Sequence, residues 1–176
     1  MEEIQATAQS QLLRFVLAGQ NYAFDVLKAH EVLSMVKITP LPSSMDFLTG
    51  VINLRGSVIP VVDLRKKFGL PAVADTADTS IIIVEVQHEG EQTLIGALVD
   101  SVRGVFRCEA KDLEPAPRFG MKLNANLVRA IAKKDGDFTV VLDTDKVFSD
   151  KELWLVREEA PGNAIAGAEP EQGGSG

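Results

Sequence analysis

The chain has 176 residues, enough for one domain or for two small domains that pack together. Its net charge of −7 argues against general binding to nucleic acid or anionic membranes, which both require basic surface. No apolar run reaches the ~20 residues that cross a bilayer. The single cysteine, Cys108, excludes an internal disulfide, and the acidic N-terminus does not resemble a signal peptide. We therefore expect a cytoplasmic protein that does not insert into a membrane.

Short strands separated by turns dominate the expected secondary structure. In the first half we expect a flexible N-terminus at 1–10, strands at 12–17 and 22–26, a segment without a clear period at 26–33, a helical turn at 43–48 capped by Ser43 or Ser44, a hairpin at 50–64 and a linker at 69–79. In the second half we expect strands at 81–86, 93–99, 102–107, 127–132 and 138–143, a helix at 145–157 capped by Thr144, and a disordered tail at 161–176.

Landmarks in the first half recur in the second. Asp25 and Asp100 each end a strand, and Pro40-x-Pro42 matches Pro115-x-Pro117 at the same offset (100 − 25 = 75, 115 − 40 = 75). Further along, Val-x-Asp-x-x-Lys-x-Phe occurs at 61–68 and again at 141–148. This order of matches predicts an internal duplication of a small β unit. We expect two packed barrels of about five strands, at about 11–79 and 80–143, which share an interface because each is too small to bury much surface alone.

Patterns of enzyme and metal chemistry are incomplete in this sequence. His30-Glu31 begins a zinc-protease pattern, but Ser34 stands where the second histidine is needed. The phosphate-binding loop, the Gly-x-Ser-x-Gly elbow and a calcium loop are also not matched. We predict no enzymatic activity, no metal and no cofactor. The alternative of a small β-barrel hydrolase lacks a nucleophile and base that the sequence could pair.

Arg55 and Glu31 are the first functional candidates. The turn of the hairpin Gly50–Leu64 contains Asn, Gly and Ser for its geometry but does not require an arginine. The corresponding turn in the second half, at 133–137, lacks the sequence Asn-Leu-Arg-Gly, which favours a selected contact at Arg55 over an internal salt bridge. Glu31 is either an ordinary exposed charge or a polar contact at the rim of an apolar docking patch.

The same residues carry a resemblance to a known family. They are Phe15-x-Leu17, Tyr22-x-x-Asp25-Val26-x-x-x-x-Glu31-Val32, Gly50-Val-Ile-Asn-Leu-Arg-Gly56, Ile59-Pro-Val-Val-Asp-Leu64, Gly96-x-x-Val99-Asp100-x-Val102 and Pro115-x-Pro117. Their order over residues 12–157 resembles the CheW family of chemotaxis adaptors. The same module occurs in the CheA histidine kinase and at the front of CheV, and the stand-alone adaptor fits this chain best.

The resemblance implies two SH3-like five-stranded barrels with a C-terminal helix, in a CheW-like domain over 11–157. It also implies a non-catalytic scaffold that couples methyl-accepting chemoreceptor tips to the regulatory domain of CheA, within a membrane-associated array of this two-component system. The alternative is a related adaptor in a twitching or second-messenger pathway. The receptor-binding residues that we predict are Glu31, Val32, Gly50, Ile52, Asn53, Arg55 and Val102. The resemblance does not place the kinase-binding residues.

Overall fold

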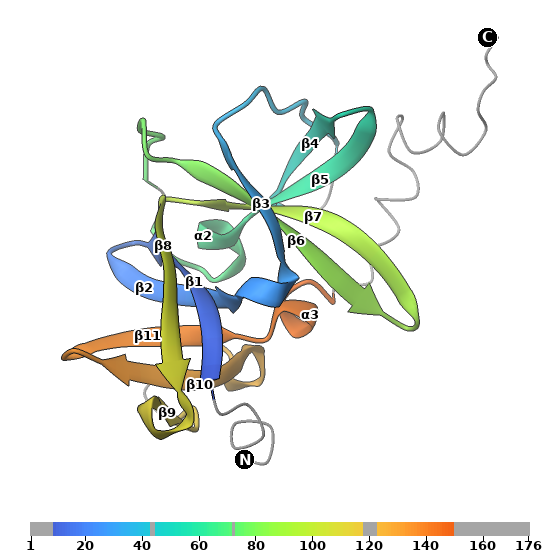
Figure 1. Ribbon diagram of the computed structural model, residues 1–176. Coiled ribbons are helices and arrows are strands. Elements are labelled where there is room, and N and C mark those ends of the chain that lie inside the picture. Colours follow the sequence, from blue (N-terminus) through green and yellow to red (C-terminus); the bar gives the residue numbers. More distant parts are fainter. Residues whose placement is uncertain (1–8, 43–44, 72, 118–122, 150–176) are drawn as a thin grey trace, which may run out of the picture.

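The structure is a computed structural model that describes residues 9–42, 45–71, 73–117 and 123–149. Within these ranges the chain forms mostly β-strands, which are arranged in two sheets (Figure 1). The strands are β1 (Gln9–Leu17), β2 (Gln20–Asp25), β3 (Ala29–Ser34), β4 (Leu48–Leu54), β5 (Ser57–Asp63), β6 (Ser80–His88), β7 (Glu91–Val99), β8 (Ser101–Glu109), β9 (Leu113–Glu114), β10 (Val128–Lys134) and β11 (Asp137–Leu142). The short helices are α2 (Leu64–Lys67) and α3 (Thr144–Val147), and the 3₁₀ turns are η1 (Val26–Lys28), η2 (Ala110–Asp112) and η3 (Ala125–Leu127).

Each sheet combines antiparallel hairpins with one parallel pair. The six-stranded sheet has the order β8-β1-β2-β11-β10-β9, and the five-stranded sheet has the order β3-β6-β7-β5-β4. The parallel pairs are β2 with β11 and β5 with β7. Without β9, the two orders match strand by strand: β8, β1, β2, β11 and β10 correspond to β3, β6, β7, β5 and β4. The predicted mainly β fold with two similar units is confirmed.

Strand registers show the duplication at the level of single residue pairs. In the hairpin β4–β5, Leu48 pairs with Val62, and the equivalent pair in β10–β11 is Val128 with Leu142, each shifted by 80 residues. A register irregularity follows the first of these residues in both hairpins. Beyond β3, Thr39 bridges to Val51, just as Glu114 of β9 pairs with Ile131 of β10. Equal registers at equal offsets indicate two copies of one supersecondary unit.

The two copies exchange strands, so the sheets do not divide at the boundary near residue 79 that we predicted between two barrels. The first hairpin, β1–β2, lies in the sheet that holds β8–β11, and β6–β7 lies in the sheet that holds β3–β5. The chain crosses between the sheets just after Asp25 and again just after Asp100. The repeat period records the order of strands along the chain and not the sheet that each strand joins.

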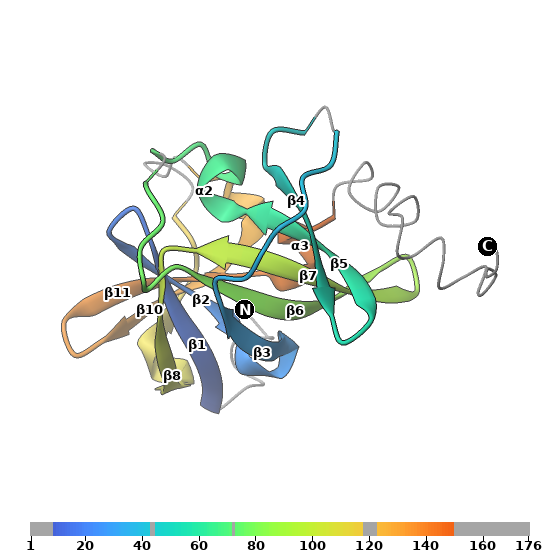
Figure 2. The same ribbon diagram turned by 90° about the horizontal axis from the view of Figure 1, so that it is seen from above.

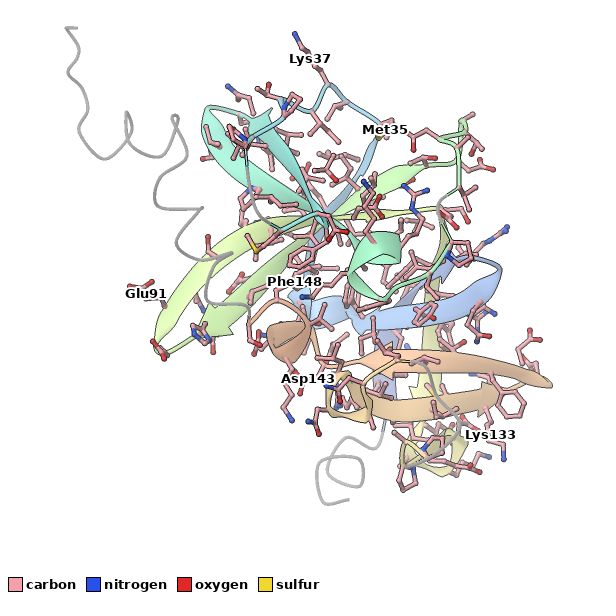
Figure 3. All side chains as sticks on the ribbon, turned by 180° about the vertical axis from the view of Figure 1, so that it is seen from behind. Met35, Lys37, Glu91, Lys133, Asp143 and Phe148 are labelled. Atoms are coloured by element: carbon pink, nitrogen blue, oxygen red, sulfur yellow. The ribbon has the colours of Figure 1, made fainter. Side chains whose placement is uncertain are left out.

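The buried apolar side chains form three clusters, one of which holds the two sheets together. The largest lies between the sheets and includes Phe15, Phe24, Ile82 and Phe148, and Figure 3 shows Phe148 beside α3. A second cluster lies within the five-stranded sheet and a third within the six-stranded sheet. Because each buried Phe or Ile stabilises the fold by roughly 1.5–3 kcal/mol, the shared cluster fixes one sheet against the other.

A buried arginine joins the predicted linker to the second crossing point. The Arg65 guanidinium donates to both carboxylate oxygens of Asp63, at 3.0 and 3.1 Å, and to Asp100 Oδ1 at 3.1 Å. It also donates to the carbonyl of Val73 at 2.8 Å, while Asp100 Oδ2 accepts from the backbone N–H of Ala18 at 2.8 Å. The segment 73–79 has no helix or strand, as predicted, but Arg65 anchors it to the fold.

Three local predictions differ from the structure. The segment 26–33 forms the turn η1 and most of β3. In the segment 43–48, Ser43 and Ser44 lie outside the described residues, residues 45–47 form no helix, and β4 begins at Leu48. The N-cap of α3 is Asp143 and not Thr144, because the Asp143 carboxylate accepts from the N–H of Lys146 at 3.2 Å. The helix α3 ends at Val147, and residues 150–176, with the predicted tail, lie outside the described residues, as do residues 1–8.

Candidate partner-binding site

The turn of the hairpin β4–β5 consists of two residues, Arg55 and Gly56. Both have positive φ, 50° and 91°, which is the geometry of a type I′ turn. Such turns favour Asn, Asp or Gly at the first position, and the equivalent turn between β10 and β11 has Asp135 there with φ of 54°. Arginine is therefore not the residue that the turn prefers, so a contact elsewhere is the better explanation for it.

Asn53 has a clear role within this turn. Its Oδ1 accepts a hydrogen bond from the backbone N–H of Gly56 at 2.8 Å. This bond satisfies a turn donor and fixes the direction in which the chain returns to β5. The side chain is exposed and keeps its amide N–H groups for other partners.

Arg55 forms a two-pronged ion pair with Glu31 on β3. Its Nη2 donates to Glu31 Oε1, and its Nη1 donates to Oε2 at 3.4 Å. Because β3 and β4 stand at opposite ends of the strand order, this contact shows that the outer strands of the sheet curl toward each other. The side chain of Arg55 is 68% exposed and that of Glu31 is 28% exposed.

The ion pair keeps both groups charged. The hydrogen bond from Arg55 lowers the pKa of Glu31, and the same bond raises the pKa of Arg55. Water and salt compete with an ion pair at the surface, so the pair contributes little to folding. The two charges are therefore held in a fixed geometry but remain accessible to a partner.

Gly50 is required by a close backbone approach. Thr39 and Val51 exchange two backbone hydrogen bonds of 2.8 Å, which bring the chain beyond β3 against β4. A Cβ atom at Gly50 would lie 2.1 Å from the carbonyl oxygen of Thr39, a distance that no relaxed structure allows. The structure thus gives Gly50 a role in folding, independent of any contact with a partner.

The remaining predicted residues fall in different environments. Val32 on β3 is 43% exposed, close in sequence to three further exposed apolar side chains, Leu27, Met35 and Val36. Ile52 is only 2% exposed and belongs to the cluster within the five-stranded sheet, so its side chain does not offer a surface contact. Val102 lies on β8 in the other sheet, pairs with Phe15 and packs against the shared core.

The structure therefore brings Glu31 and Arg55 into contact and leaves Val102 on a separate sheet. The sequence analysis did not single out Leu27, Met35 and Val36, and Figure 3 shows Met35 on the segment that continues β3. The sequence signal for these three side chains was the segment 26–36, which is rich in apolar residues but follows neither the strand period nor the helix period. The sequence analysis also missed Arg65, whose signal was a charged residue directly after the predicted hairpin at 50–64.

No group of three or more His, Cys, Asp and Glu side chains that could hold a metal occurs among the described residues. Within the same ranges, the helices are all too short to span a membrane. Burial raises the pKa of the Cys108 thiol, which opposes formation of a reactive thiolate. The fold and the exposed ion pair together define a small β-sheet binding module.

Comparisons with known proteins agree with this class. The family model described as CheW-like domain matches residues 11–152. The chain is 30% identical to the chemotaxis protein CheW of Klebsiella aerogenes over 85% of this chain and 88% of the relative, and 36% identical to CheW of Thermotoga maritima over 82% and 91%. The crystal structure of the scaffolding protein TtCheW from Thermoanaerobacter tengcongensis matches with a TM-score of 0.72 and 34% identity, covering 81% of this chain and 89% of that one.

The chain belongs to the CheW-like family. It is accordingly a non-catalytic adaptor of bacterial chemotaxis signalling. The names of these relatives favour the chemotaxis adaptor over the alternative of a twitching or second-messenger pathway. The match to TtCheW also agrees with the predicted SH3-like, two-unit architecture.

Proposed function

We propose that this adaptor couples the cytoplasmic tips of chemoreceptors to the regulatory domain of the histidine kinase CheA. In this role it holds receptor and kinase in register, so that the receptor state shifts the balance between active and inactive kinase. Binding to both partners recruits the protein to membrane-associated receptor arrays. It inserts no segment of its own into the membrane and binds no nucleic acid.

One observation supports a receptor contact at Arg55 and Glu31. The ion pair of Arg55 and Glu31 is exposed, and Arg55 lies on a turn whose counterpart contains Asp135. Next to Glu31 on β3 is the exposed Val32. Arginine is common at interface centres because its planar fork combines directional hydrogen bonds with packing area. Glu31, Val32, Asn53 and Arg55 are the contact residues in this proposal.

The proposal gives other roles to three of the predicted residues, Gly50, Ile52 and Val102. Gly50 and Ile52 shape the backbone and interior beneath the contact and do not touch the receptor with their side chains. Val102 marks a second contact on β8, at the start of the strand that follows the crossing at Asp100.

Arg55→Asp tests the proposal directly. The substitution places in this turn the residue that the equivalent turn already has, with nearly the same φ, so the hairpin should fold. It also places a carboxylate beside Glu31 and removes the arginine fork. We expect receptor-stimulated kinase activity to fall by at least an order of magnitude, about 1.4 kcal/mol of lost coupling.

The control is Asp135→Asn in the equivalent turn, which changes a charge but is expected to leave kinase stimulation unchanged. Circular dichroism and denaturant unfolding should show that both variants fold. Full stimulation by folded Arg55→Asp would remove Arg55 from the receptor contact. Unfolding of Arg55→Asp would show that Arg55 is required for the fold. Receptor binding would then be measured with Arg55→Asn instead.

A further inference from the structure

An apolar side chain at the first crossing between the sheets is almost fully exposed. Leu27, on the turn η1, is 87% exposed, and Val32 on the following strand β3 is 43% exposed. We call these two residues the η1–β3 face. The strand order places β3 at the edge of the five-stranded sheet, and Figures 1 and 2 show it on the outside of the molecule. In the other copy, the residue equivalent to Leu27 is Val102 (102 − 27 = 75), which is partly buried against the shared cluster.

The helix α3 is anchored beside this face. Asp145 on α3 forms an ion pair of 3.0 Å with Lys28, the residue that follows Leu27, and Figure 1 shows η1 next to α3. Ser149 is the last residue that the structure describes before the chain end, and its hydroxyl donates to the carbonyl of Lys146 at 2.9 Å. The chain therefore continues beyond Ser149 from a point that is fixed beside α3 and close to η1.

The internal repeat shows the course of the chain after the equivalent helix, α2. Arg65 of α2 is equivalent to Asp145, and it binds Asp100 at the second crossing at 3.1 Å. The chain after α2 stays beside that crossing, because Arg65 also donates to the carbonyl of Val73 at 2.8 Å. The residue equivalent to Val73 after α3 is Leu153 (153 − 73 = 80). The repeat therefore predicts that the chain near Leu153 runs beside the first crossing.

The sequence at this position is strongly apolar. Residues 153–156 read Leu-Trp-Leu-Val and contain the single tryptophan of the chain. Four residues span at most about 14 Å when extended, so a chain that leaves Ser149 can bring Leu153 to η1. Apolar side chains of this size are usually buried, since burial removes their surface from water. The segment 153–156 and the η1–β3 face are thus two apolar surfaces that the repeat places together.

We infer that the segment 153–156 docks on the η1–β3 face, covers Leu27 and Val32, and competes with the receptor for the contact proposed at Glu31 and Val32. Docking is a property of this chain alone, whereas the competition rests on the proposed function. The receptor must displace the segment before it can bind. Its apparent affinity is then reduced in proportion to the fraction of chains in which the face is open.

The fluorescence of Trp154 tests docking in the full chain without any partner. A docked segment gives a blue-shifted emission and slow quenching by acrylamide, because water and quencher do not reach the indole. We expect Leu27→Asp to shift the emission to that of an indole in water and to speed the quenching. The matched control is Phe138→Asp, which changes an exposed apolar side chain of the other sheet in the same way and should leave both properties unchanged.

Receptor binding tests the competition, again with the full chain. The double variant Leu153→Ser/Leu155→Ser removes apolar surface from the segment and keeps Trp154 as the probe. If the segment covers the face in about nine chains of ten, this variant should bind a receptor cytoplasmic fragment about tenfold more tightly than the unmodified chain. The matched control, Ile165→Ser, removes an apolar side chain further along the same end of the chain and should leave the affinity unchanged.

Three results would overturn the inference. The first is a Trp154 emission that is already solvent-like in the unmodified chain, or that Leu27→Asp and Phe138→Asp change equally. The second is an emission that depends on protein concentration, because a second copy of the chain would then be the occupant of the face. The third is a receptor affinity that Leu153→Ser/Leu155→Ser leaves unchanged.

Failure of this inference is distinguishable from failure of the proposed function. If Trp154 is exposed to solvent while Arg55→Asp still loses receptor binding, the proposed function stands and only this inference fails. If neither the unmodified chain nor Leu153→Ser/Leu155→Ser binds the receptor, the proposed function fails and the competition fails with it. The fluorescence of Trp154 still decides in that case whether the segment docks.

Discussion

The turn that contains Arg55 does not require an arginine. The same type I′ turn occurs with alanine, arginine, glutamate or aspartate at its first position, at Ala18, Arg55, Glu89 and Asp135. The backbone therefore does not select arginine. The contact that the structure shows for Arg55 is an internal ion pair with Glu31, whose carboxylate accepts from both ends of the guanidinium.

At this scale we predict that removing Arg55 raises the pKa of Glu31. A carboxylate whose pKa is lowered in the folded state contributes stability above the unfolded pKa, and this contribution disappears as the pH falls through the folded pKa. Arg55→Asn keeps a residue that tolerates positive φ, removes the ion pair and should return the pKa of Glu31 toward its ordinary value. Carboxyl NMR titration measures the shift, and Arg103→Asn, which removes a cation from the other sheet, should leave Glu31 unchanged. An identical pKa in the chain with and without Arg55 would mean that the pair does not form in solution.

Sequence patterns could indicate Arg55 and Glu31 one at a time but not as a pair. They are 24 positions apart: Glu31 lies on β3 and Arg55 on the turn between β4 and β5, and β3 is a neighbour of neither strand in the sheet. For Ile52 the prediction fell on a residue whose side chain points into the interior, because a hairpin pattern gives the alternation of faces without showing which face is covered.

The equivalent helices α2 and α3 have the same kind of N-cap in different surroundings. Each begins at an aspartate N-cap, Asp63 or Asp143, and each is followed by a buried phenylalanine, Phe68 or Phe148. The two caps differ in their environment. Asp63 is buried against Arg65, whereas Asp143 is about 4.0 Å from the exposed Lys146.

We therefore predict unequal effects of the same substitution at equivalent positions. Asp143→Ala should lower the free energy of unfolding by about 1 kcal/mol, the usual cost of losing a cap. Asp63→Ala should lower it by about 3 kcal/mol, because it also leaves the buried guanidinium of Arg65 short of a counter-charge, with Asp100 compensating in part. Urea unfolding of both variants measures the difference. Equal losses in the free energy of unfolding would show that the ion pair between Asp63 and Arg65 does not stabilise the fold.

Over the whole molecule, the exchange of strands makes each copy dependent on the other. Neither sheet can be completed from one half of the chain, since β1 and β2 pair with later strands while β6 and β7 pair with earlier ones. The shared cluster adds side chains from both sheets to one core. Figure 1 shows the resulting arrangement, in which the sheets lie against each other and the six-stranded sheet takes strands from before and after those of the five-stranded sheet.

This arrangement predicts that the halves fold only together. Fragments 1–79 and 80–176, cut in the segment that precedes β6, should each lack cooperative unfolding when expressed alone. Mixed or co-expressed, they should assemble and recover a sigmoidal denaturation curve, because the exchanged hairpins are held by backbone pairing and by the shared core. Cooperative unfolding of either fragment by itself would contradict the exchange of strands.

The sequence by itself determined the hairpins, their turns and the presence of two copies. β-branched runs, X-Gly turns and the repeated Val-x-Asp-x-x-Lys-x-Phe are local patterns, and local contacts follow directly from local residues. Only the tertiary structure decided which sheet each hairpin joins, that Arg55 meets Glu31 and that Ile52 is covered. These outcomes depend on where the chain crosses after Asp25 and Asp100, and a crossing is set by the packing of both copies around one core.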